Sequence, residues 1–132
     1  MRGENNPSWR EDREQFELEK KLRKKFYKAL QSTLAATGKK KVGRTSDMLG
    51  YGPKELKNHV TNHPNWNRVK CENWHLDHIF PISAFIEHGV TDPAIVNHLD
   101  NLQPVTQKEN NQKWATYDKK AFEKWLIEHE IF

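Results

Sequence analysis

The segment Trp-His-Leu-Asp-His-Ile at residues 74–79 carries the side chains with the clearest potential for chemistry. Hydrolysis of a phosphodiester needs a base that activates water and a hard cation that neutralises the charge developing on phosphorus. His78 has a suitable ring for the first task, and the carboxylate of adjacent Asp77 offers oxygen ligands for the second. Taken alone, this pattern is also compatible with a core strand or with a different metal site.

Two asparagine-containing segments follow the histidine segment. Asn101 stands in Asp-Asn-Leu-Gln-Pro at residues 100–104, and Asn110 stands in Glu-Asn-Asn-Gln-Lys at residues 109–113. Two short strands that flank a long excursion and lead into a helix would bring both asparagines next to the histidine segment. The three segments support one another, and together they indicate a phosphodiester hydrolase.

In these segments the sequence resembles the HNH endonucleases, which share the ββα-metal fold. The likeness covers roughly residues 74–114 and includes the nine-residue spacing from Asn101 to Asn110, which matches the family pattern. Residues 49–57, Leu-Gly-Tyr-Gly-Pro-Lys-Glu-Leu-Lys, are also similar to a segment that precedes the motif in phage-encoded members. The resemblance therefore extends to most of the chain and implies a homing or nicking DNA endonuclease.

The resemblance also implies roles for individual residues. Asp77 and Asn110 would ligate one divalent cation through oxygen, and His78 would be the general base. Asn101 would fix the loop between the strands and orient His78. Asn110 stands where some members have histidine, and oxygen ligands favour Mg²⁺ or Mn²⁺ over zinc. The expected reaction is one-metal hydrolysis that leaves 5′-phosphate and 3′-hydroxyl ends.

Two neighbouring residues could take related roles. A one-residue shift of register would exchange Asn110 for Asn111, although the spacing favours Asn110. His75 lies two residues from Asp77 and so on the same strand face, where it could support a ligand or contact substrate. Because Asp77 and His78 would face opposite sides of an ideal strand, we expect the strand to bend or end there.

Basic residues concentrate between Lys20 and Arg44, a stretch with ten lysines and arginines and no acidic residue. Such a block attracts a phosphate backbone, because each neutralised phosphate releases counterions. A solvated helix face followed by a basic loop would give the same pattern. The residues expected to contact DNA are Lys24, Lys28, Lys39, Lys40, Lys41, Arg44 and Lys113.

Caps and periodicity predict the elements that position these residues. A capping box at Ser8 and Glu11 should start a long helix that ends near Gly38. Its apolar stripe comprises Phe16, Leu22, Phe26, Leu30 and Leu34. A basic loop, a short turn near residues 48–49, a helix over about 53–62 and a connector over 65–73 should follow. Strands over 74–79 and within 99–105 should flank short helices near 83–88 and 92–98.

The end of the chain should be helical. Thr106 and Glu109 form a second capping box, which predicts that a helix follows the second strand directly. Asp118 should open a last helix with Phe122, Trp125 and Leu126 on its buried face.

The length and composition of the chain limit the classes of protein to which it can belong. A chain of 132 residues supports about one hydrophobic core. The single cysteine, Cys71, excludes an internal disulfide and a zinc knuckle built from paired cysteines. No apolar run reaches the length of a membrane span, and residues 1–6 lack the apolar region of a signal peptide. We therefore expect a cytoplasmic protein, in the host bacterium if it is phage-encoded.

These observations predict an α+β fold, with a ββα-metal (HNH) core, an N-terminal helical extension, a C-terminal helix and no zinc knuckle. Residues 1–64 would form the basic DNA-binding extension and residues 65–132 the nuclease core, in one compact unit. The expected cofactor is one Mg²⁺ or Mn²⁺ ion per active site, and the expected partner is double-stranded DNA. Monomer and homodimer stay open, as do nicking and double-strand cutting. The alternatives are a non-cleaving DNA-binding module on the same fold and a nuclease acting on RNA.

Overall fold

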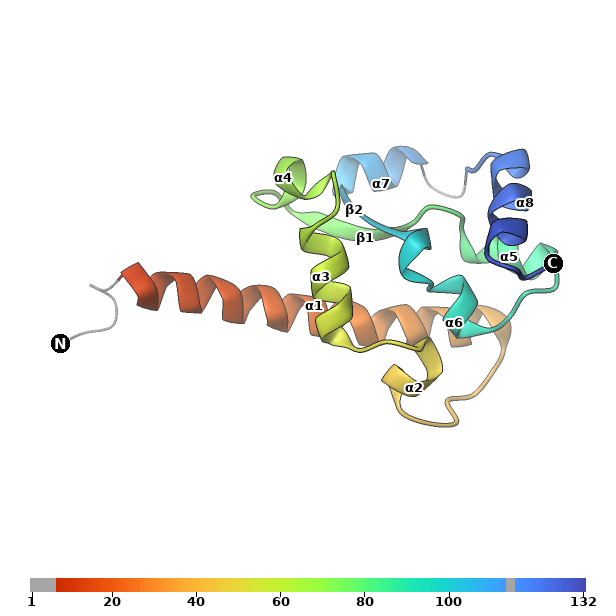
Figure 1. Ribbon diagram of the computed structural model, residues 1–132, viewed down its shortest axis with the longest axis horizontal. Helices are drawn as coiled ribbons and strands as arrows, with labels where there is room; N and C mark the ends of the chain where they lie inside the picture. Colours follow the sequence, from red (N-terminus) through yellow and green to blue (C-terminus); the bar gives the residue numbers. More distant parts are fainter. Residues whose placement is uncertain (1–6, 114–115) are drawn as a thin grey trace.

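A computed structural model describes residues 7–113 and 116–132, with residues 7–11 described by their backbone alone. The elements in chain order are α1 (Pro7–Thr37), α2 (Thr45–Leu49), α3 (Pro53–Thr61), α4 (Trp66–Val69), β1 (Trp74–His78), α5 (Ile82–Glu87), α6 (Pro93–Val96), the 3-10 helix η2 (Leu99–Asn101), β2 (Leu102–Thr106), α7 (Gln107–Lys113) and α8 (Lys119–Glu128) (Figure 1). The predicted α+β class is confirmed, because helices surround a two-stranded antiparallel sheet. Trp114, which the motif region reaches, and the capping side chains of Ser8 and Glu11 lie outside the described residues.

The sheet joins the two motif strands in the predicted order. Trp74 pairs with Thr106 and His78 pairs with Leu102, so the strands run antiparallel over their full length. α7 begins directly after β2 and packs against both strands, and Figure 1 shows the sheet lying between α1 and α7. β1 ends at His78, but Asp77 and His78 both pair in regular register, with Gln103 and Leu102, so the strand does not bend or end between them and the expected irregularity was wrong.

α1 is the longest helix and supplies one wall of the core. It spans 31 residues and ends before Gly38, whose φ of 72° suits a glycine beyond a helix terminus. Leu22, Phe26 and Leu30 are buried as predicted, but Phe16 is 62% exposed, so its place in the buried stripe was wrong. Figure 1 explains the difference, since the N-terminal half of α1 projects beyond the elements that could cover it. No helix in the described ranges is long and apolar enough to cross a membrane.

The first hydrophobic cluster crosses the predicted boundary at residue 64. It joins side chains of α1, α2 and α3 to side chains of α4, β1 and β2. Its buried members are Leu22, Phe26, Leu30, Leu49, Leu56, Val60, Val69, Trp74 and Leu102. The helical extension and the strands therefore share a core. The connector before β1 contains the short helix α4, which its polar, broken sequence did not predict.

The second hydrophobic cluster forms around the excursion between the strands, which comprises residues 79–101. It packs α8 against α5 and α6, and its buried members are Phe80, Ala84, Phe85, Val90, Val96, Phe122 and Leu126. Asp118 caps α8 by accepting a hydrogen bond from the N–H of Ala121, as predicted. The cluster fixes the end of the excursion, from which the chain returns to β2.

The predicted capping box at the start of α7 is present and carries an additional ion pair. Thr106 Oγ1 accepts a hydrogen bond from the Glu109 N–H at 3.2 Å, and Glu109 Oε1 accepts one from the Thr106 N–H at 3.0 Å. Arg68 of α4 donates to the same carboxylate oxygen. These contacts, led by Arg68, lower the pKa of Glu109 to about 2.

We expect the substitution Glu109→Gln to reduce the dependence of stability on acid pH. A carboxylate whose pKa is depressed in the folded state contributes stability above its ordinary pKa, and this contribution is lost as pH falls toward the folded value. The free energy of unfolding of the wild type should therefore fall more steeply than that of the variant between about pH 5 and pH 2. Urea denaturation across this range measures the difference. Glu17→Gln, at an exposed position of α1, is the matched control, and equal slopes in wild type and Glu109→Gln would contradict the prediction.

Candidate active site

A cavity of about 240 Å³ lies between α1, β1 and α7 and brings several of the predicted site residues together. It is lined by Lys25, Lys28, Ala29, Ser32, His75, Leu76, His78, Ile82 and Asn110. α1 contributes its basic face, β1 contributes both histidines, and α7 contributes the asparagine. Asp77 precedes His78 in β1 and Asn101 lies in η2, and neither residue lines the cavity.

His78 is oriented by a hydrogen bond to Asn97. The ring Nε2 lies 2.7 Å from Asn97 Oδ1, while the Asn97 amide nitrogen donates to Thr33 Oγ1 at 2.7 Å and to the Pro93 carbonyl at 3.1 Å. Those two acceptors fix which end of the amide faces the ring. Because an amide oxygen only accepts, Nε2 carries a proton, and the lone pair of neutral His78 is on Nδ1.

The environment of His78 favours its neutral form. Burial lowers the pKa of the ring, and the hydrogen bond to Asn97 and the charge of Asp77 act in the opposite direction. A neutral ring with an unprotonated Nδ1 is the form that can accept a proton from water. The surroundings therefore supply both the tautomer and the protonation state of a general base.

The sequence analysis did not identify Asn97. This residue, and not Asn101, makes the contact that orients His78. Asn101 fixes the loop between the strands as predicted: its side chain bonds the N–H and carbonyl of Phe80 and the carbonyl of Val96. All three partners are backbone groups, so the contact that orients His78 comes from Asn97 instead. Both asparagines are fully buried. The only sequence signal for the contact between Asn97 and His78 was the position of Asn97 at the end of a short capped apolar segment.

Asp77 is held against β2 and α7. It is 5% exposed, and Gln103, its partner across the sheet, donates to Oδ2 at 2.9 Å. The ammonium of Lys113 lies 3.6 Å from the same oxygen and donates to the carbonyl of His78 at 2.8 Å. Lys113 is thus turned inward, and its predicted contact with DNA phosphate stays a prediction.

α7 distinguishes the two candidate asparagines. Asn110 lines the cavity together with His78, whereas Asn111 is exposed. Asn110 and Lys113 are three residues apart and so share one helix face, which is the face toward β1. Asn110 is therefore the asparagine near the histidine. That it shares one cation with Asp77 stays a prediction.

His75 lines the same cavity and has an unsatisfied atom. Its Nε2 is buried and has no hydrogen-bond partner among the described residues. Burial, followed by the charge of Lys25, lowers the pKa of this ring. A buried polar atom without a partner is uncommon in folded proteins, so His75 has the capacity to bind a group that enters the cavity.

The cavity is lined by a lysine of α1 that was not among the residues predicted to contact DNA. Lys28, which was predicted to contact DNA, lines the cavity, and Lys24 is exposed on the same helix. Lys25 also lines it, and Lys21 and Lys25 lie 4.6 and 4.9 Å from the centre of the Trp74 ring. Lys21, Lys25 and Lys28 are spaced four and three residues apart, so helical periodicity could have identified this row.

The basic loop at residues 38–44 does not line the cavity. Lys39, Lys40, Lys41 and Arg44 are all exposed on the chain between α1 and α2. In Figure 1 this loop lies on the opposite side of α1 from the sheet. None of these four residues lines the cavity, and any DNA contact by them stays a prediction.

Together these groups define what the site can do chemically. Two lysines can attract a phosphate, a neutral imidazole can accept a proton, and carboxylate and carboxamide oxygens are available on neighbouring elements. Comparisons of the chain with protein-family models, curated proteins and solved structures found no match.

Proposed function

We propose that the chain is a divalent-metal-dependent DNA endonuclease of the HNH type, with its active site at the cavity between α1, β1 and α7. One observation carries this proposal: His78 is fixed by Asn97 in the tautomer of a base and shares a cavity with Asn110 and two lysines. The succession of β1, β2 and α7 agrees with a ββα-metal core. The motif residues, distant in sequence, are close in the fold.

The residues near α7 fit a hard divalent cation. Asp77 and Asn110 would hold it, because carboxylate and carboxamide oxygens are the ligands that Mg²⁺ and Mn²⁺ prefer. The ammonium of Lys113 lies beside Asp77 and the His78 carbonyl, so these oxygens can pair with a cation, and a bound metal ion would take the place of that ammonium at Asp77. When bound, the cation would neutralise the negative charge that develops on the phosphate and the leaving oxygen.

The remaining groups would act on the water and the DNA. His78 would accept a proton from the attacking water at Nδ1, while Asn97 holds the opposite edge of the ring. Lys25 and Lys28 would bind phosphates of the strand that enters the cavity. Asn97 and Asn101 are positioning residues, since Asn101 ties together the two ends of the excursion that carries Asn97.

Incubation with supercoiled plasmid tests this function. We expect cleavage in Mg²⁺ or Mn²⁺, none in EDTA, and products with 5′-phosphate ends. Relaxed circles would show nicking, and linear DNA without a nicked intermediate would indicate two cooperating active sites. DNA binding without cleavage under any divalent cation would overturn the proposal in favour of a non-cleaving module. Cleavage of RNA alone would overturn the assignment of DNA as the substrate.

We expect DNA affinity to depend on pH through Lys25. Burial, with the like charges of Lys21 and Lys28, lowers the pKa of Lys25 to about 8. The side chain is therefore charged below this pH and loses charge above it, so DNA should bind more weakly at about pH 9 than at about pH 7. Fluorescence anisotropy at constant ionic strength measures the affinities. Lys25→Met should flatten the pH dependence and reduce the salt slope by about 1.

Lys24→Met is the matched control, because Lys24 is exposed on the same helix and lies outside the cavity. It should leave the pH dependence intact. An identical pH dependence in wild type and Lys25→Met would contradict the assignment of Lys25 to the DNA-binding face.

A further inference from the structure

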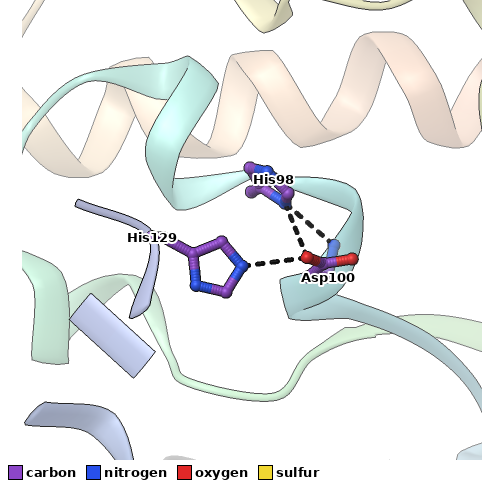
Figure 2. Close-up of side chains that lie close together, drawn as sticks. All are labelled: His98, Asp100 and His129. Atoms are coloured by element: carbon purple, nitrogen blue, oxygen red, sulfur yellow. Dashed lines mark hydrogen bonds and ion pairs between the residues drawn. The ribbon is translucent and has the colours of Figure 1, made fainter. Parts of the chain in front are cut away.

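His98, Asp100 and His129 form a side-chain cluster that the proposed active site does not use. Figure 2 shows both imidazole rings beside the carboxylate of Asp100. His129 Nε2 lies 2.9 Å from Asp100 Oδ2, and His98 Nδ1 lies 3.8 Å from the same oxygen. One potential ligand atom from each residue lies within 4.8 Å of the other two. Two imidazole nitrogens and a carboxylate oxygen are a common set of three protein ligands for zinc.

The ring of His129 is already oriented for metal binding. Its Nδ1 lies 2.8 Å from the carbonyl oxygen of Trp125, and because a carbonyl only accepts, Nδ1 carries a proton. The other nitrogen, Nε2, lies 2.9 Å from Asp100 Oδ2 and donates a proton to that carboxylate, which only accepts. A bound cation would take the place of this proton, and the lone pair on Nε2 would then be directed at the cation. The Trp125 ring stacks on the imidazole at 3.9 Å and limits its rotation. Metal-binding histidines commonly donate their second nitrogen to a backbone carbonyl in this way.

His98 also directs a lone pair toward the cluster. Its Nδ1 accepts a hydrogen bond from the backbone N–H of Asp100 at 3.0 Å, so this nitrogen is unprotonated. A cation would replace that amide as the partner of the lone pair. The side chains of His98 and Asp100 are 45% and 60% exposed, so an ion can reach them from solvent.

The three residues come from two parts of the chain. His129 follows the last turn of α8, whereas His98 and Asp100 lie at the turn η2, directly before Asn101. An ion bound by all three would join the C-terminal helix to the turn that leads into β2. The sequence alone gave no reason to connect them, because nearly thirty residues separate His129 from Asp100.

We propose that His98, Asp100 and His129 bind one Zn²⁺ ion, with water as a fourth ligand, and that this ion fixes the end of α8 to η2. Imidazole ligands favour zinc over magnesium, so this site differs in chemistry from the oxygen ligands assigned to the active site. The inference does not depend on the proposed endonuclease activity.

Calorimetric titration with Zn²⁺ in the presence of excess Mg²⁺ tests the site. We expect one Zn²⁺ per wild-type chain, and an increase in the midpoint of thermal unfolding when it binds. His129→Gln and Asp100→Asn should each lower Zn²⁺ affinity by at least about tenfold. The control His88→Gln, at the end of α5, and Asp77→Asn, at the active site, should leave Zn²⁺ affinity unchanged.

Absence of Zn²⁺ binding by the wild type would overturn the proposal. It would also be overturned if His129→Gln and Asp100→Asn retained full affinity, or if Asp77→Asn abolished binding. Circular dichroism checks the fold of each variant. If His129→Gln does not fold, His98→Gln replaces it, because His98 is exposed and not part of either hydrophobic cluster.

Discussion

Replacing His78 with alanine is expected to lower the single-turnover rate of DNA cleavage by at least about 100-fold, while the Kd for DNA stays unchanged. The substitution removes the unprotonated Nδ1 that would accept a proton from water, and it leaves the lysines of α1 in place. The rate and the Kd are measured separately, with cleavage followed at saturating protein in Mg²⁺ and binding followed in EDTA.

The matched control for this prediction is His88→Ala, which removes a histidine outside the cavity. It should cleave at the wild-type rate. Because His78→Ala leaves the Asn97 carboxamide oxygen without its partner, some loss of stability is expected, on the order of 1–3 kcal/mol. Urea denaturation shows whether the variant is folded under assay conditions. Cleavage by folded His78→Ala at the wild-type rate would refute the role of His78 as the general base.

Replacing Asp77 with asparagine is expected to abolish the stimulation of cleavage by Mg²⁺, with a loss of about 100-fold or more in rate. The carboxamide keeps the size of the side chain and can still accept from Gln103, but it carries no charge to hold the cation. A titration of cleavage rate against Mg²⁺ and Mn²⁺ concentration measures the effect.

Asp47→Asn is the control for this substitution, because Asp47 is exposed on α2, away from the cavity. It should show the wild-type dependence on Mg²⁺. If Asp77→Asn responded to Mg²⁺ as the wild type does, Asp77 would not be a ligand, and its place beside Lys113 would be purely structural.

The sequence predicted the elements whose signals are local. The capping box at Thr106 and Glu109 determines where α7 starts, and α7 follows β2 without a loop. The motif segments predicted two short strands that flank an excursion, and β1 and β2 pair in this arrangement. These signals act over a few residues, so periodicity and capping chemistry were sufficient to predict the ββα succession around the site.

The contacts that complete the site depend on tertiary packing and could not be predicted in this way. Asn97 reaches His78 only because α6 packs near α1, where Thr33 and Pro93 fix the amide. His98 and His129 meet only because the second hydrophobic cluster brings α8 back to the excursion. The predicted burial of Phe16 was wrong for a related reason. Periodicity identifies the apolar face of a helix, but it does not show how far along the helix other elements cover that face.

A crystal structure of His78→Ala with DNA and Mn²⁺ would test the proposed active site most directly, because the ion can be located by its anomalous scattering. We predict one Mn²⁺ bound by Asp77 and Asn110, with a DNA phosphate in the cavity beside Lys25 and position 78. DNA bound only to the outer face of α1, or Mn²⁺ bound without Asp77 and Asn110, would contradict this assignment.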